Sequence, residues 1–135
     1  MRFDFALLAD AAEVVGGKLY IHGGGLTRMT AASLPWTQSL SICMRLEPGA
    51  EDDVSRPWQF RVIVVGPDDH PIFEHQTPIT LSKPDVDIAP GEAPGVLLAL
   101  TLSSLVVHHH GPHRVRLAFD GAETELPFAV VAPDS

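Results

Sequence analysis

Residues 113–131 read HRVRLAFDGAETELPFAVV. Apolar side chains alternate there with polar or small ones on both sides of Asp120-Gly121. A period of two places one set of side chains on a buried face and the other set in water, as in a β-strand. Asp-Gly is typical of the tight turn between antiparallel strands, because it adopts positive φ at low cost. The segment therefore predicts a β-hairpin.

A two-stranded hairpin is only marginally stable in water, so the preceding residues must supply strands that cover its apolar face. Strand-like patterns occur in segments 3–9, 18–22, 37–47, 58–65, 72–75, 77–81 and 96–107. Gly, Pro and Asp turns separate them, and no segment has the pattern of an amphipathic helix. The chain is therefore predicted to be an all-β, antiparallel β-sandwich of about eight or nine strands, immunoglobulin-like or C2-like, with a jelly roll or a closed barrel as the alternative.

The first two segments lie close enough in sequence to form a hairpin of their own. In the first, Phe3, Phe5 and Leu7 fall on one face. Residues 10–15 either extend that strand or form a short helical turn. Gly23 to Gly25 indicate a bulge or a close approach of another backbone or of a bulky side chain, rather than a phosphate-binding loop.

Later segments carry further expectations. Residues 96–107 form either one long strand or a strand that bends at Ser103-Ser104. Residues 82–95 contain three prolines and are predicted to be a loop. Pro127 cannot donate a backbone hydrogen bond, which indicates that the last strand lies at a sheet edge. The inward side chains of segment 37–47 are predicted to be Leu40, Ile42, Met44 and Leu46.

The length of 135 residues suits a single domain, residues 1–135. A formal net charge of −8 argues against nucleic acid and against an anionic membrane as partners. The lone cysteine, Cys43, cannot form an intramolecular disulfide and is expected to be structural. The N-terminal residues do not have the pattern of a secretory signal. We therefore expect a cytoplasmic protein.

The histidines are the one group that suggests chemistry. His108 and His110 are two residues apart, which places both imidazoles on one face of a strand, and His113 follows across Gly111-Pro112. Three imidazoles with an open fourth position can hold zinc or another divalent metal. The favoured interpretation is nevertheless a solvated turn, because no carboxylate stands at a telling spacing. No catalytic residue and no cofactor-binding residue are assigned.

The arginines offer a second hypothesis. Arg45, Arg61, Arg114 and Arg116 all occupy outward strand positions. They would line a solvent-exposed sheet face, where they either bind an anion or a partner or simply keep the sheet soluble.

Two stretches of the sequence resemble a known family. The opening combines residues 5–11 (FALLADA) with residues 17–24 (GKLYIHGG), and the close combines Gly111-Pro112-His113-Arg114-Val115 with Asp120-Gly121 and Leu126-Pro127-Phe128. Both stretches resemble a family of short bacterial proteins of unknown function. The resemblance implies a β-sandwich and carries no activity or catalytic residue. The histidine triplet is not part of that pattern.

These observations favour a non-enzymatic binding or assembly module that acts through a sheet face or an edge strand. Its partner is expected to be another protein or a second copy of the chain. The alternative is a metal-binding protein or a metal-dependent enzyme that uses the turn around His108, His110 and His113.

Overall fold

A computed structural model describes residues 1–53, 55–81, 90–91 and 95–134. These described residues form ten strands, which are β1 (Arg2–Ala9), β2 (Ala11–Val15), β3 (Lys18–His22), β4 (Arg28–Thr30), β5 (Trp36–Glu47), β6 (Trp58–Val65), β7 (Pro71–Ile79), β8 (Val96–Val107), β9 (Gly111–Phe119) and β10 (Ala122–Val131). The described residues form no helix. The all-β fold class is therefore confirmed.

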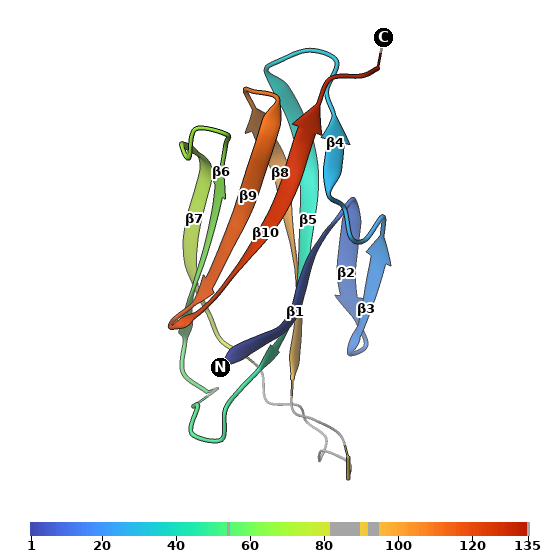
Figure 1. Cartoon of the computed structure of the whole chain (residues 1–135). Helices are drawn as coiled ribbons and strands as arrows, with labels where there is room; N and C mark the ends of the chain where they lie inside the picture. Colours follow the sequence, from blue (N-terminus) through green and yellow to red (C-terminus); the bar gives the residue numbers. More distant parts are fainter. Residues whose placement is uncertain (54, 82–89, 92–94, 135) are drawn as a thin grey trace.

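Two sheets pack face to face as a β-sandwich (Figure 1). One has three strands in the order β1-β5-β8, and the other has five in the order β4-β10-β9-β6-β7. All pairs are antiparallel except β4 with β10, which are parallel. β2 and β3 form a separate hairpin that lies against β5 and β8.

One apolar core lies between the two sheets. The alternation in β5 buries the four side chains that the sequence predicted, Leu40, Ile42, Met44 and Leu46. β6 contributes Phe60, whose ring centroid lies 5.1 Å from that of Phe119 on β9. β6 is central, since it pairs with both β7 and β9.

The terminal hairpin forms as predicted, with β9 paired to β10 across Asp120-Gly121. The positive φ of its turn lies at Asp120, at 46°, and not at Gly121. Pro127 lies on β10 between β9 and an open side, because β4 covers only residues 129–131. Ala129 donates its N–H to the carbonyl of Thr27, on the side of β10 that faces away from β9. Pro127 lies two residues earlier, so its nitrogen faces that same side, and no described strand pairs with β10 at that position. The edge prediction thus holds for the first part of β10.

Three local predictions were wrong. The strand over residues 3–9 does not pair with residues 18–22; it pairs with β5, and β2 supplies the partner of β3. A bulge between Phe3 and Phe5 breaks the alternation, so Phe3 packs against the core while Phe5 is exposed. Segments 72–75 and 77–81 are not two strands, since β7 runs unbroken through Pro71–Ile79.

Residues 96–107 form one strand, β8, with an irregularity opposite Gln38 and Leu40. Ser103 and Ser104 together stand opposite Ser39, one residue more than on β5, so the predicted bend is a bulge within a continuous strand. Most of the predicted loop at 82–95 lies outside the described residues.

Cys43 is fully buried on the outer side of β5, between Ile42 and Met44 of the core. Its Sγ donates to the carbonyl of Leu7 at 3.6 Å, and burial raises the pKa of the thiol. The contacts of β2 with β5 and β8 explain why this outer face excludes water there.

Candidate functional site

The strands at open sheet edges differ in how well they are protected against pairing with a strand of another molecule. A free edge exposes unpaired N–H and C=O groups, and proteins commonly protect it with charge, proline or a bulge. β1 carries Arg2 and Asp4, β7 carries Pro71 and Pro78, and β10 carries Pro127 with two glutamates. β8 is also an edge strand, but its sequence, VLLALTLSSLVV, has neither a charged residue nor a proline.

Backbone directions identify which residues of β8 face the open edge. The carbonyl of Leu8 accepts bonds from Gly25 and Leu26, at 2.9 and 3.0 Å, so the backbone of Leu8 faces away from β5. Its partner Ile42 must then direct its N–H and C=O toward β8, where Leu100 stands opposite.

Since neighbouring residues of a strand point to opposite sides, Leu97, Ala99 and Thr101 direct their backbone groups away from β5. No described strand pairs with them. The contact between Ser41 Oγ and Thr101 Oγ1, at 3.1 Å, agrees with this register, because side chains lie closest at pairs without backbone bonds.

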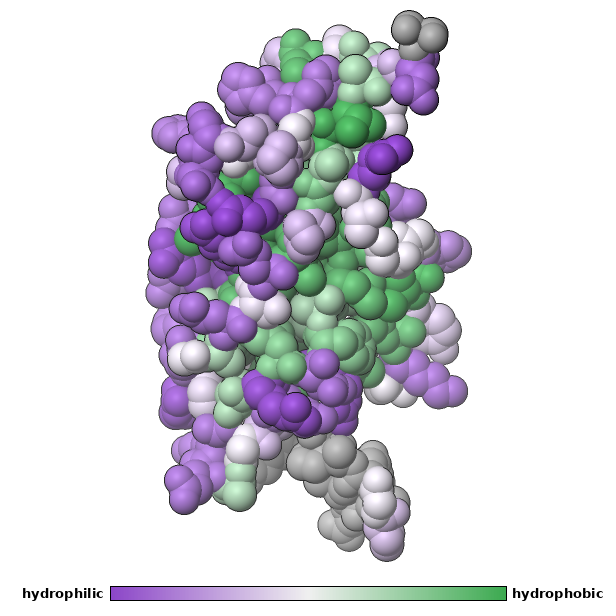
Figure 2. All heavy atoms as spheres, in the orientation of Figure 1, coloured by the Kyte–Doolittle hydropathy of each residue, from purple (hydrophilic) through white to green (hydrophobic). Residues whose placement is uncertain are grey.

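Apolar side chains are only half-buried along this edge. The five consecutive residues from Val96 to Leu100 are aliphatic, and each is of intermediate exposure. β2 and β3 contact β8, and their hairpin exposes Val14, Val15, Tyr20 and Ile21. Figure 2 shows the apolar surface that extends over β1 and this hairpin. The open edge of β8 therefore borders an apolar surface.

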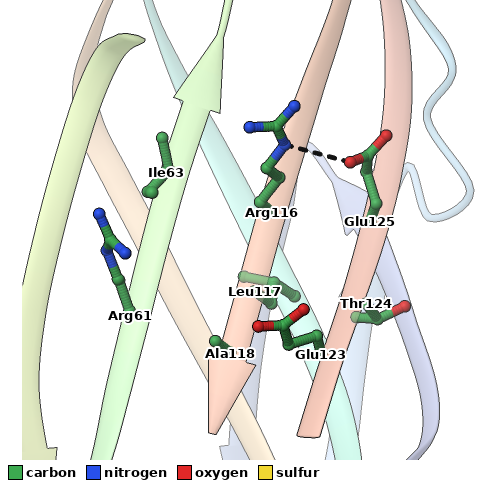
Figure 3. Close-up of a pocket in the computed structure, with 8 residues that line it drawn as sticks. All are labelled: Arg61, Ile63, Arg116, Leu117, Ala118, Glu123, Thr124 and Glu125. Atoms are coloured by element: carbon green, nitrogen blue, oxygen red, sulfur yellow. Dashed lines mark hydrogen bonds and ion pairs between the residues drawn. The ribbon is translucent and has the colours of Figure 1, made fainter. Parts of the chain in front are cut away.

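A shallow groove of about 530 Å³ lies on the outer face of the five-stranded sheet (Figure 3). Arg61 comes from β6, Arg116 and Ala118 from β9, and Glu123 and Glu125 from β10. The register places Ile63 beside Arg116 and Ala118 beside Arg61, so short or aliphatic side chains lie between charged ones.

The guanidinium groups of this face are already paired. Arg61 contacts Glu74 at 2.6 Å, and Arg116 contacts Glu125 at 3.2 Å. Arg114 forms ion pairs with Asp69 and with Glu125. These pairs neutralise the arginines, which weakens the case for an anion site.

Only three of the four arginines share this face. Arg45 lies on β5 of the other sheet, next to Asp4 and Glu47 at 3.0 and 2.8 Å. Those hydrogen bonds raise the pKa of Arg45, with the bond to Glu47 as the largest cause.

The structure separates the three histidines that were considered as metal ligands. His110 is exposed and its Nε2 lies 2.9 Å from the carbonyl of Ala31. His113 is buried, and its Nδ1 lies 3.0 Å from the carbonyl of Gly111. His108 shares a pocket with His113 and not with His110.

That pocket has a volume of about 180 Å³ and lies where the β6–β7 and β8–β9 turns meet. Its lining combines His113 and His108, which the sequence already brought together, with groups that the sequence did not connect to them. These residues are Gly66, Pro67, Asp68, His70, Ile72 and His109. The sequence signal that would have helped is the position of both segments at strand ends, because turns at the same end of a sandwich can meet.

Within the described chain, no three His, Cys, Asp or Glu side chains stand where they could jointly hold a metal ion. The zinc hypothesis for His108, His110 and His113 stays a prediction. Across the same residues there is also no helix long and apolar enough to cross a membrane.

The comparison with known families agrees with the resemblance at the two ends of the chain. No curated protein matches the sequence significantly. The model of one family, described as a family of unknown function (DUF6941), matches residues 4–131. The match covers all ten described strands apart from Arg2 and Phe3, the first two residues of β1. The chain therefore belongs to the DUF6941 family.

Proposed function

We propose that this protein is a non-enzymatic assembly module in which the open edge of β8 pairs with β8 of a second copy. The observation that carries the proposal is the contrast among edge strands: β8 alone among the described strands has neither charge nor proline. An exposed edge of this kind readily adds another strand.

A second copy fits the charge of this edge. The chain has a formal net charge of −8, so two copies repel each other over most approaches. Residues 96–107 contain no charged side chain, so antiparallel pairing of two β8 strands brings no like charges directly opposite each other. Such a contact has twofold symmetry, the commonest arrangement of homo-oligomers.

The half-buried aliphatic side chains add to this argument. Pairing would place the partner's side chains directly beside those of Leu97–Leu100 on each face of the sheet, and it would join two three-stranded sheets into one. Each apolar square ångström removed from water contributes roughly 25 cal/mol. Backbone bonds would set the register, and apolar burial would supply the free energy.

The test is native mass spectrometry of the untagged protein, with the Ala99→Pro variant beside it. Proline at position 99 removes an N–H that faces the open edge, and so it leaves the bonds between β8 and β5 in place. We expect a dimer for the wild type and a monomer for Ala99→Pro. Circular dichroism and the thermal midpoint verify that the variant is folded.

Glu123→Pro is the matched control. Its N–H also faces an open edge, on β10, because position 123 has the same backbone direction as Pro127. This variant should remain a dimer. A wild type that stays monomeric at all concentrations, or a dimer that survives Ala99→Pro, would overturn the proposal, as would a complex with a different protein that uses β8.

A further inference from the structure

The pocket between the β6–β7 and β8–β9 turns contains a buried side chain with an unused acceptor. His113 is 1 % exposed and stacks on Phe128. The carbonyl of Gly111 can only accept a hydrogen bond, so the proton of the neutral ring lies on Nδ1. Nε2 then has a free lone pair, and no hydrogen bond joins it to a described residue. Since no fully buried side-chain nitrogen or oxygen in the described part of the chain lacks a partner, this nitrogen is accessible from the pocket.

A carboxylate faces the same space. A Cβ on Gly66 would stand 3.9 Å from His113 Nε2 and 3.6 Å from Asp68 Oδ1. Because glycine has no Cβ, the volume between these two acceptors is open. The backbone carbonyl of His70 also lies 3.9 Å from that point. Three acceptors of different kinds therefore surround one small space.

The charge states of the His113 imidazole and the Asp68 carboxylate also make both groups hydrogen-bond acceptors. Burial lowers the pKa of His113, which keeps the imidazole neutral near pH 7. The backbone N–H of His70, 3.2 Å from Oδ1, lowers the pKa of Asp68 and keeps its carboxylate ionised.

We infer that this pocket binds a small organic cation with several N–H donors, of the guanidinium class. One donor meets Nε2 of His113 and another meets the carboxylate of Asp68, while Pro67 and Ile72 supply apolar contact. The volume of about 180 Å³ accommodates a group of a few heavy atoms and no larger ligand. A metal ion fits less well, because among the described residues no three His, Cys, Asp or Glu side chains stand where they could share one ion. The inference does not depend on the pairing of β8.

The experiment is a titration of the ¹⁵N-labelled protein with methylguanidinium, with sodium chloride at equal ionic strength as the reference. We expect saturable shifts at Gly66, His70 and His113. Asp68→Asn keeps the size and removes the charge, and it should weaken binding roughly tenfold. Gly66→Ala should abolish binding, because its Cβ projects between the acceptors and, at a φ outside the left-handed region, fits without strain.

Glu13→Gln is the control, since it removes one exposed negative charge on β2, outside this pocket. Its affinity should equal that of the wild type. Three results would overturn the inference: shifts that do not saturate, equal affinity in Asp68→Asn and the wild type, or saturable binding of zinc at these residues without binding of methylguanidinium.

Discussion

Phe128 lies stacked on the imidazole of His113, with the ring centroids 5.1 Å apart and the planes inclined by 24°. The contact buries an ionisable group in the core, and burial lowers its pKa from the ordinary value of 6.5. The charged form is therefore disfavoured in the folded state and accessible in the unfolded state.

Stability should consequently depend on pH through His113. As the pH falls through about 6.5, the unfolded chain binds a proton that the folded chain still excludes. The free energy of unfolding is thus highest above that range and falls by up to about 1.4 kcal/mol per pH unit below it, until His113 is protonated in the folded state as well. Urea denaturation from pH 8 to pH 5 measures this slope.

His113→Gln should reduce the slope, and His110→Gln, which alters an exposed residue, should leave it unchanged. Equal slopes in all three proteins would show that His113 does not control the pH dependence.

The aromatic pair of Phe60 and Phe119 should dominate core stability. Phe119 is completely buried, and its replacement by Ala removes the ring contact and leaves a cavity. We expect Phe119→Ala to lower the free energy of unfolding by about 3–5 kcal/mol. Phe5→Ala, at a side chain that is 36 % exposed, should cost less than about 1 kcal/mol. Similar losses in the two variants would argue against this placement of the core.

Substitutions at Asp120, the first residue of the turn in the terminal hairpin, should lower the stability of the protein. Asp120 adopts a φ of 46°, which a β-branched side chain strongly disfavours. Asp120→Val should therefore destabilise the protein by about 1–2 kcal/mol. Gly121→Ala should have little effect, because its φ is not left-handed and its Cβ would meet no atom within 4 Å. Thermal unfolding of both variants tests whether the left-handed residue of the turn is Asp120. A larger loss of stability for Gly121→Ala than for Asp120→Val would contradict this.

Cys43 should be unreactive in the folded protein. Its side chain is fully buried, and its raised pKa lowers the fraction of thiolate. Labelling with a disulfide reagent at neutral pH should thus be slow in buffer and fast in urea. Rapid labelling of the native protein would indicate that the β2–β3 hairpin opens away from β5.

The sequence predicted those parts of the fold that depend on local pattern. The alternation along β5 and β6 and the Asp-Gly turn after Phe119 each specify a strand or a turn within a few residues. What could not be predicted depends on long-range pairing. β1 pairs with β5 although residues 18–22 lie nearer in sequence, and the bulge after Phe3 reverses which aromatic ring faces inward.

For the candidate sites, too, the local pattern could be predicted from the sequence, whereas the features that depend on long-range pairing could not. The absence of charge and proline in β8 is visible in the sequence, but the exposure of that edge depends on the strand order. From the sequence, His113 is expected either in a solvated turn or, with His108 and His110, as a metal ligand. Its position on β9, opposite Phe128 on β10, places it in the core instead.

The parallel pair of β4 and β10 has a consequence for the order in which the sheet is completed. Ala31 N–H bonds to the carbonyl of Val131, and Ala129 N–H bonds to that of Thr27, so a strand from the first quarter of the chain is held by its last ten residues. Phe128 and Val130 of the same segment fill the core. β10 lies between β4 and β9 in the sheet and follows both of them in sequence. β4 and β9 therefore gain their shared neighbour, and the core gains Phe128 and Val130, only when residues 122–131 join the sheet.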